Sequence, residues 1–112
     1  MSVKAVLIST SGHVEITQIE ANRDTLKGIV GGWIESLDLL NGDHAYLNDE
    51  GKTLGLPYNH LANTVFHQMN PYLSAGDLIV GDVVLLGDDV EGDEADVSED
   101  TINQVLAWRS LL

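Results

Sequence analysis

The chain has 112 residues, 44% of them hydrophobic, which is enough to form one domain (residues 1–112) around a buried core. With 18 acidic and 5 basic residues its net charge is −13, which disfavours direct binding to nucleic acid or to an anionic membrane. The absence of cysteine excludes disulfides and thiolate metal sites and favours a reducing compartment, so we expect a cytoplasmic protein.

The first elements along the chain are a predicted hairpin and a short helix. Segments 3–9 and 13–19 are rich in β-branched residues and flank a turn at 10–12, which is typical of a β-hairpin. Apolar residues from 26 to 30 then recur at helical spacing. We expect a helix of about two turns that starts near Asn22 or Asp24 and ends on Gly31 and Gly32.

A second predicted hairpin follows this helix. Segment 33–40 nearly alternates apolar and polar residues, and it precedes the strong turn signal Asn41-Gly42. We therefore predict a strand over 33–40 and a partner strand over 44–48. After another turn, residues 52–56 are expected to continue the sheet.

The second half of the chain predicts two more helices and a buried strand. Leu61, Val65 and Met69 recur every fourth residue, so we predict a helix that is capped by Asn59 and ends before Pro71. Residues 77–87 hold two apolar runs broken at Gly81, and the second, 83–86, is typical of a central strand covered on both faces. Ser98 is expected to cap a last helix whose apolar face contains Ile102, Val105, Leu106 and Arg109.

Together these elements predict an α+β fold. We expect a mixed, mostly antiparallel sheet of about five strands built from hairpins, packed by two short helices and a C-terminal helix.

Four stretches resemble a family of small uncharacterised domains found in actinobacterial phages and mobile elements. The matching motifs are Val-Gly-Gly-Trp-Ile-Glu, Asn-Asp-Glu-Gly, Gly-Leu-Pro-Tyr-Asn and Val-Gly-Asp-Val-Val-Leu-Leu-Gly, within residues 25–106. The resemblance implies a phage or mobile-element accessory protein acting in a bacterial host cytoplasm. It implies no catalytic residue.

Motifs for catalysis, cofactors and metals are absent from the sequence. Lys52-Thr53 lacks the first glycine of a phosphate-binding loop, and no Gly-x-Ser-x-Gly or Gly-x-Gly-x-x-Gly occurs. His60 and His67 are seven residues apart, whereas helical zinc ligands are usually three or four apart. An EF-hand placed on the acidic stretch would have glycine and serine at its key carboxylate positions. We therefore predict a non-enzyme without a catalytic residue, cofactor or metal.

The acidic stretch from 88 to 100 holds eight of the 18 acids, and no Lys or Arg occurs from Thr53 to Trp108. One interpretation is a solvated loop that leads into the last helix; the other is a surface for a basic partner or a DNA mimic. The residues of that candidate surface are Asp88, Asp89, Glu91, Asp93 and Glu94.

Two aromatic residues, Trp33 and Tyr58, each follow a turn. They belong either to the protein's own core or to a contact surface, where such residues commonly anchor partners. We include them in the candidate binding surface, together with Asn59, His60 and His67.

The function favoured by these observations is a non-catalytic accessory protein that binds a host protein, in particular a basic one. The alternative is a homo-oligomer that sequesters a small ligand such as a nucleotide signal. In that case the amides of Gly31 and Gly32 would face a phosphate, with Arg23 and Lys27 nearby.

Overall fold

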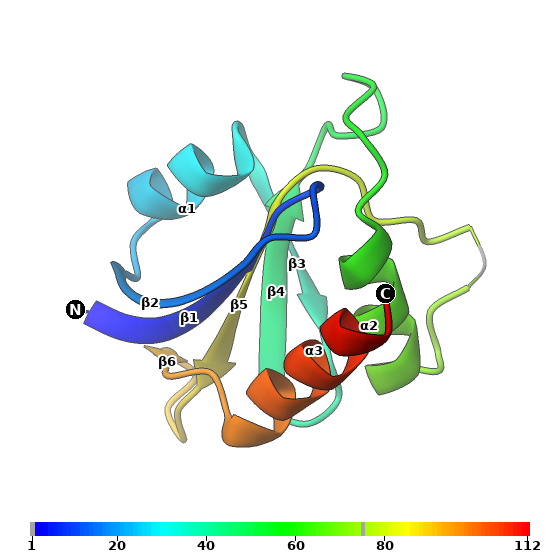
Figure 1. Ribbon diagram of the computed structural model, residues 1–112. Coiled ribbons are helices and arrows are strands. Elements are labelled where there is room, and N and C mark those ends of the chain that lie inside the picture. The colour runs from blue at the N-terminus through cyan, green and yellow to red at the C-terminus, as the bar shows by residue number, and fades with distance from the viewer. Residues whose placement is uncertain (1, 75) are drawn as a thin grey trace.

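The computed structural model describes residues 2–74 and 76–112 and has an α+β fold with one open antiparallel sheet (Figure 1). Its strands are β1 (Ser2–Ile8), β2 (Val14–Glu20), β3 (Ile34–Asp38), β4 (Asp43–Asn48), β5 (Val83–Asp88) and β6 (Glu94–Ala95). Its helices are α1 (Arg23–Val30), α2 (His60–Met69) and α3 (Glu99–Leu111). The strand order is β2-β1-β5-β4-β3, with β6 paired to β5, so the two predicted hairpins form the two sides of the sheet.

The helix boundaries follow from local hydrogen bonds that the sequence predicts. The side chains of Asn22, Asn59 and Ser98 each accept a bond from a backbone amide in the first turn of α1, α2 and α3. Gly31 adopts a left-handed conformation, with φ of 82°, and closes α1. These predicted caps are confirmed. They could be predicted because each depends on residues no more than four positions apart.

The two faces of the sheet are covered by different helices. On β5, Val83 and Leu85 pack with α2 and α3, whereas Val84 and Leu86 pack with α1. Successive strand residues point to opposite faces, so a strand covered on both sides must be apolar throughout. The predicted central strand is confirmed, and the side of the sheet on which a residue lies can be read from this alternation.

The segment 52–56, which was expected to continue the sheet, does not do so. Residues 52–56 form turns, in which the amides of Leu54 and Leu56 bond to the carbonyls of Glu50 and Gly51. The first apolar run near 78–80 is not a strand either. The buried side-chain amide of Asn63 donates to the carbonyl of Ile79 and accepts from its amide, and so replaces a neighbouring strand.

The sheet and the last helix also differ from the prediction. All strand pairs are antiparallel and the sheet has six strands, because a short strand, β6, forms inside the acidic stretch. On α3, Leu106 and Arg109 are exposed, whereas Ile102 and Val105 are buried and Trp108 packs against the core. The buried face of α3 is therefore rotated about the helix axis relative to the predicted face.

Candidate functional site

A histidine cluster lies on the face of the sheet that α1 covers, near the start of β4. We use this name for His44 and Tyr46 of β4 together with Asp88 and Glu94. His44 pairs across the sheet with Leu86, and Asp88 pairs with Glu94. Directly paired residues and residues two apart on a strand share a face. The pairing of β4, β5 and β6 therefore brings all of these side chains to one place.

The imidazole of His44 lies between the two carboxylates and is itself buried, with 6% of its side chain exposed. Its Nε2 is 2.6 Å from Oε1 of Glu94, and its Nδ1 is 3.3 Å from Oδ1 of Asp88. The hydroxyl of Tyr46 donates to Oε2 of Glu94 at 2.6 Å. Burial, and then the bond to Glu94, raise the pKa of this hydroxyl. Tyr46 is therefore a neutral hydrogen-bond donor at physiological pH.

Nδ1 of His44 is buried and has no hydrogen-bond partner among the described residues. Such atoms are rare in folded proteins because an unpaired buried polar group costs about 1–3 kcal/mol. The cluster is thus incomplete in its hydrogen bonding, although it holds two carboxylates.

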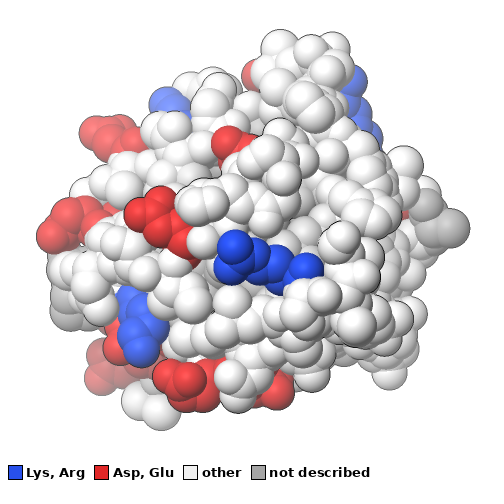
Figure 2. Space-filling model, viewed as in Figure 1, with Lys and Arg blue, Asp and Glu red and all other residues white. Residues whose placement is uncertain are grey.

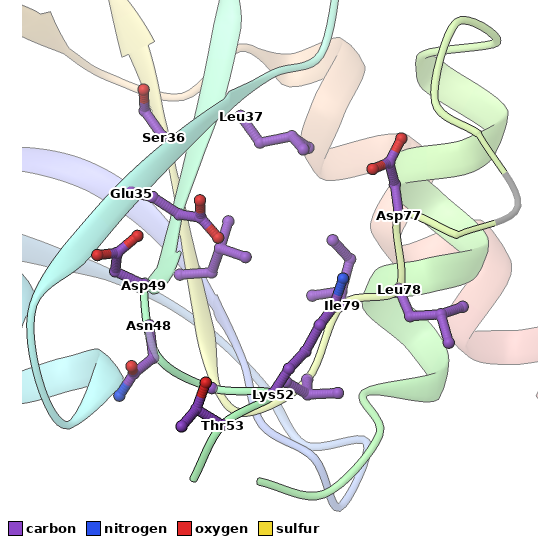
Figure 3. Close-up of a pocket in the computed structure, with 13 residues that line it drawn as sticks. Glu35, Ser36, Leu37, Asn48, Asp49, Lys52, Thr53, Asp77, Leu78 and Ile79 are labelled. Atoms are coloured by element: carbon purple, nitrogen blue, oxygen red, sulfur yellow. The ribbon is translucent and has the colours of Figure 1, made fainter. Parts of the chain in front are cut away.

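A second candidate site, which we call the edge pocket, lies beside the outer strand β3 (Figure 3). It has a volume of about 330 Å³ and is lined by β3, by the end of β4 with the turn that follows it, and by residues 77–80. Its charged residues are Glu35, Asp49 and Asp77, with one lysine, Lys52. Burial, and then the charge of Asp49, raise the pKa of the Glu35 carboxyl. The pocket therefore carries negative charge that is only partly compensated.

The outer edge of β3 adjoins this pocket. The amide of Leu39 bonds to Asp43 and the carbonyl of Trp33 accepts from Asp49, so odd-numbered residues bond to β4. The backbone groups of Ile34 and Ser36 must then point outward, because an antiparallel strand alternates in this way. Within residues 2–74 and 76–112, β3 has no strand on that side.

The predicted aromatic residues are exposed and lie in different places. Trp33 is 57% exposed, and Nζ of Lys27 lies 3.7 Å from the centre of its ring. Tyr58 is 49% exposed, and its ring is 6.0 Å from that of the exposed His60 at the start of α2. The alternative that these rings fill the core is wrong. Trp33 thus lies against Lys27 of α1, whereas Tyr58 lies beside His60 at the start of α2.

The other predicted α2 residues have structural contacts. Asn59 is fully buried, which corrects its placement on a binding surface: its side chain donates to the carbonyls of Ile8 and Gly81. His67 is partly buried, and its Nε2 is 3.0 Å from the carbonyl oxygen of Asp77.

The acidic stretch is a hairpin rather than a simple loop, and we call residues 88–96 the acidic hairpin. The carboxylate of Asp89 accepts bonds from the amides of Glu91 and Asp93 and so shapes its turn. Of the predicted acids, Glu94 alone has most of its side chain shielded, being 21% exposed.

Charge is unevenly distributed over the molecule. In the view of Figure 2, carboxylates gather over β1, β2, β6 and the start of α3, whereas the side carrying α2 is mostly uncharged. Lys4 pairs with Glu99 at 3.7 Å, but both side chains are substantially exposed, so solvent screens the pair. The surface around the acidic hairpin therefore keeps a strong negative potential.

The expected phosphate site at the end of α1 loses its main support. The amides of Gly31 and Gly32 both donate to the carbonyl of Lys27, at 2.8 and 3.1 Å. They are used to end the helix and do not face outward as a pair toward an anion.

The sequence did not point to His44, Tyr46, Glu35 or Asp49 as site residues. None belongs to a short motif, since His44 and Glu94 are 50 positions apart. The only available signal was His44 at the start of a predicted strand of otherwise mainly apolar residues.

The fold and the charge place the protein in the class of acidic α+β domains with an open antiparallel sheet, and its sequence contains no recognisable catalytic motif. None of the helices in the described part of the chain has the length and apolarity needed to cross a membrane. The chain belongs to the family described as Domain of unknown function (DUF3846), whose model matches residues 3–109. No curated protein and no solved structure shows significant similarity to it. The family description assigns no reaction.

Proposed function

We propose that this chain is a non-catalytic accessory protein of a phage or mobile element that binds a basic segment of a host protein. The phage context rests on the sequence motifs, and the binding mode rests on the edge pocket. The single observation that carries the proposal is a carboxylate-lined pocket directly beside an unpaired strand edge.

An extended host segment would pair with the outward backbone groups of Ile34 and Ser36. This is strand addition, in which main-chain hydrogen bonds supply affinity and pockets for alternate side chains supply specificity. Glu35 pairs with Leu47, whose side chain belongs to the cluster under α2 and α3. A partner residue opposite Glu35 would therefore direct its side chain to the same face, where the edge pocket lies.

The chemistry of the pocket selects a cationic side chain. Burial, and then the charge of Asp49, raise the pKa of Glu35, and an arginine or lysine between the two carboxylates would favour their ionised forms. Lys52 compensates only part of the charge, and its Nζ is bonded to the carbonyl of Gly76 at 3.3 Å. The wider acidic surface would speed the encounter with such a partner.

The experiment is an NMR titration of the labelled protein, in EDTA and at physiological salt, with a short capped peptide of alternating arginine and threonine. We expect shifts at the amides of Ile34 and Ser36 and at Lys52. The double variant Glu35→Gln/Asp49→Asn should bind about tenfold more weakly, because two charge contacts of about 0.5–1 kcal/mol each are lost.

The matched control is Glu15→Gln/Glu91→Gln, which changes the net charge equally at exposed positions away from the pocket. It should alter affinity less than about twofold, because long-range attraction is screened at this salt. Equal losses in the two variants would mean non-specific charge attraction and would refute binding at the edge pocket. Absence of any shift in the unmodified protein would refute the proposal as a whole.

A further inference from the structure

We propose that the histidine cluster is a binding site for a first-row divalent cation such as Zn²⁺. His44 and Asp88 would ligate the cation, and Glu94 would orient the imidazole. The site lies at the base of the acidic hairpin, apart from the edge pocket, and does not depend on the proposed host-binding function.

The first argument is the buried nitrogen. Nδ1 of His44 has no hydrogen-bond partner among residues 2–74 and 76–112, yet it lies 3.3 Å from Oδ1 of Asp88. A cation bound by both atoms at about 2.0–2.2 Å per bond would need only a small movement of either side chain. The ligating atoms that His44, Asp88 and Glu94 offer all lie within 4.8 Å of one another. The nitrogen thus gains a partner by a small local adjustment.

The second argument is charge. Asp88 and Glu94 are directly paired between β5 and β6 and flank the same imidazole. Within residues 2–74 and 76–112, no Lys or Arg forms an ion pair with either carboxylate. Two like charges held at a partly buried place repel each other, and a divalent cation would convert this repulsion into attraction.

The third argument is the surroundings of the second ring nitrogen. A histidine that binds a metal almost always donates its other N–H to a carboxylate or carbonyl, which fixes the tautomer. Here Nε2 is 2.6 Å from Glu94, and Glu94 is in turn held by the Tyr46 hydroxyl at 2.6 Å. In the described part of the chain, Nδ1 is therefore the ring nitrogen left without a partner, 3.3 Å from Oδ1 of Asp88.

The donor set selects the type of cation. One imidazole nitrogen with carboxylate oxygens suits Zn²⁺, Mn²⁺ or Co²⁺, whereas Ca²⁺ and Mg²⁺ favour oxygen ligands alone. Waters would complete the coordination, since Asp88 is 45% exposed and opens the site to solvent. Because few protein ligands are present, Zn²⁺ should bind reversibly rather than as a permanent structural ion.

Bound metal would change the acidic hairpin. His44 belongs to β4 and Asp88 ends β5, so a shared cation ties the base of the hairpin to the body of the sheet. It would also lower the negative charge near the carboxylates of the turn. Cation binding would therefore stabilise the protein and reduce the mobility of residues 88–96.

The first test is calorimetric titration of the untagged protein with ZnCl₂ after treatment with EDTA and removal of the chelator. We expect one site that MgCl₂ does not compete for. Asp88→Asn should weaken Zn²⁺ binding at least tenfold, and Glu94→Gln should weaken it about 10–100-fold through loss of the orienting carboxylate. The control Glu91→Gln removes an equal charge from the same hairpin and should leave the affinity within about twofold.

The second test is NMR of the imidazole nitrogens, which separates ligation from attraction to the acidic surface. On addition of Zn²⁺, the Nδ1 resonance of His44 should shift while Nε2 stays protonated. Because His44→Gln replaces a buried side chain and so changes folding as well as binding, the conclusion relies on Asp88→Asn and on this spectrum. Loss of affinity that is equal in Asp88→Asn and Glu91→Gln, or an unchanged Nδ1 resonance at saturating Zn²⁺, would overturn the proposal.

Discussion

Asp43 and His44 are neighbours on β4, yet their side chains lie on opposite faces of the sheet and have opposite hydrogen-bonding states. Asp43 is buried, and its Oδ2 accepts bonds from the amide and hydroxyl of Ser98 and from the hydroxyl of Thr101. His44 is equally buried, but its Nδ1 has no hydrogen-bond partner in the described part of the chain, and two carboxylates flank its ring. We call the first group the aspartate network.

The difference shows how to separate a structural polar cluster from a candidate site. The aspartate network satisfies the charge of Asp43 with donors from the start of α3, and none of its buried side-chain atoms lacks a hydrogen-bond partner among the described residues. A fully satisfied buried network rigidifies a protein, whereas a partly satisfied one carries a free-energy cost that a ligand can remove. The histidine cluster is of the second kind, so burial alone does not identify its role.

The largest expected effect is on the aspartate network. Asp43→Ala should lower the free energy of unfolding by about 3 kcal/mol, because three donors around Oδ2 lose their buried acceptor and α3 loses its anchor on β4. Urea denaturation followed by circular dichroism measures this loss. Glu15→Ala, at an exposed acid on β2, is the control and should change stability by less than about 0.5 kcal/mol. Equal, small losses would mean that Asp43 is not a structural centre.

The next effect concerns Gly87, which pairs directly with Asp43 between β4 and β5. A Cβ at this position would collide with the backbone oxygen of Asp96 and lie 3.2 Å from Oδ1 of Asp43. Gly87→Ala should therefore cost about 2 kcal/mol and loosen the pairing of β6 with β5. In contrast, a Cβ on Gly28 in α1 meets nothing within 4 Å, so Gly28→Ala should stabilise by about 0.5–1 kcal/mol. Hydrogen exchange at β6, together with urea denaturation of both variants, measures the contrast.

The elements that are predictable from sequence are those whose signals are local. Asn22, Asn59 and Ser98 cap helices through amides three positions away, and the turn at Asn41-Gly42 joins adjacent strands. The apolar run 83–86 identified the central strand because burial on both faces removes alternation. Segment 52–56 was predicted wrongly, since turn bonds satisfy its backbone groups instead of strand pairing. The apolar run 78–80 forms no strand either, because the side chain of Asn63 bonds to the backbone of Ile79.

The candidate sites could not be predicted from local sequence patterns, because their residues are far apart in the chain. The sequence gives no local signal for the role of His44, because its carboxylate neighbours come from a strand pair much later in the chain. Asp88 and Glu94 were expected as part of one exposed acidic surface, and only the pairing of β4, β5 and β6 separates them from the other acids. Likewise, Glu35 and Asp49 can be recognised as candidate site residues only once β3 is known to be an edge strand.

A smaller effect, of opposite sign to that at Asp43, is expected at Asp88. In EDTA, Asp88→Asn should raise the free energy of unfolding by about 0.5 kcal/mol, because it removes repulsion from Glu94 and loses no hydrogen bond from His44. Urea denaturation without metal measures this change, and Glu91→Gln provides the matched loss of charge. A loss of about 1 kcal/mol or more would show that the contact between Asp88 and His44 is itself stabilising. The histidine cluster would then resemble the aspartate network.

The smallest effect tests whether the edge pocket also carries unrelieved charge. The pKa of the Glu35 carboxyl is raised in the folded protein, which means that folding disfavours its ionised form. At pH values between the pKa in the unfolded chain and the higher pKa in the folded protein, the folded state therefore binds more protons. Stability contributed by protonated Glu35 is full below its ordinary value of 4.5 and declines as the pH rises through the higher folded pKa.

Glu35→Gln should remove that decline. Because Glu35 is largely exposed, solvent screens the effect and we expect a gain of only about 0.3 kcal/mol at neutral pH relative to the unmodified protein. The measurement is urea denaturation at a series of pH values, paired with NMR titration of the Glu35 carboxyl. If the carboxyl titrates at or below its ordinary value, Asp49 and burial do not act on it. In that case the edge pocket lacks the unrelieved charge that a basic partner would neutralise.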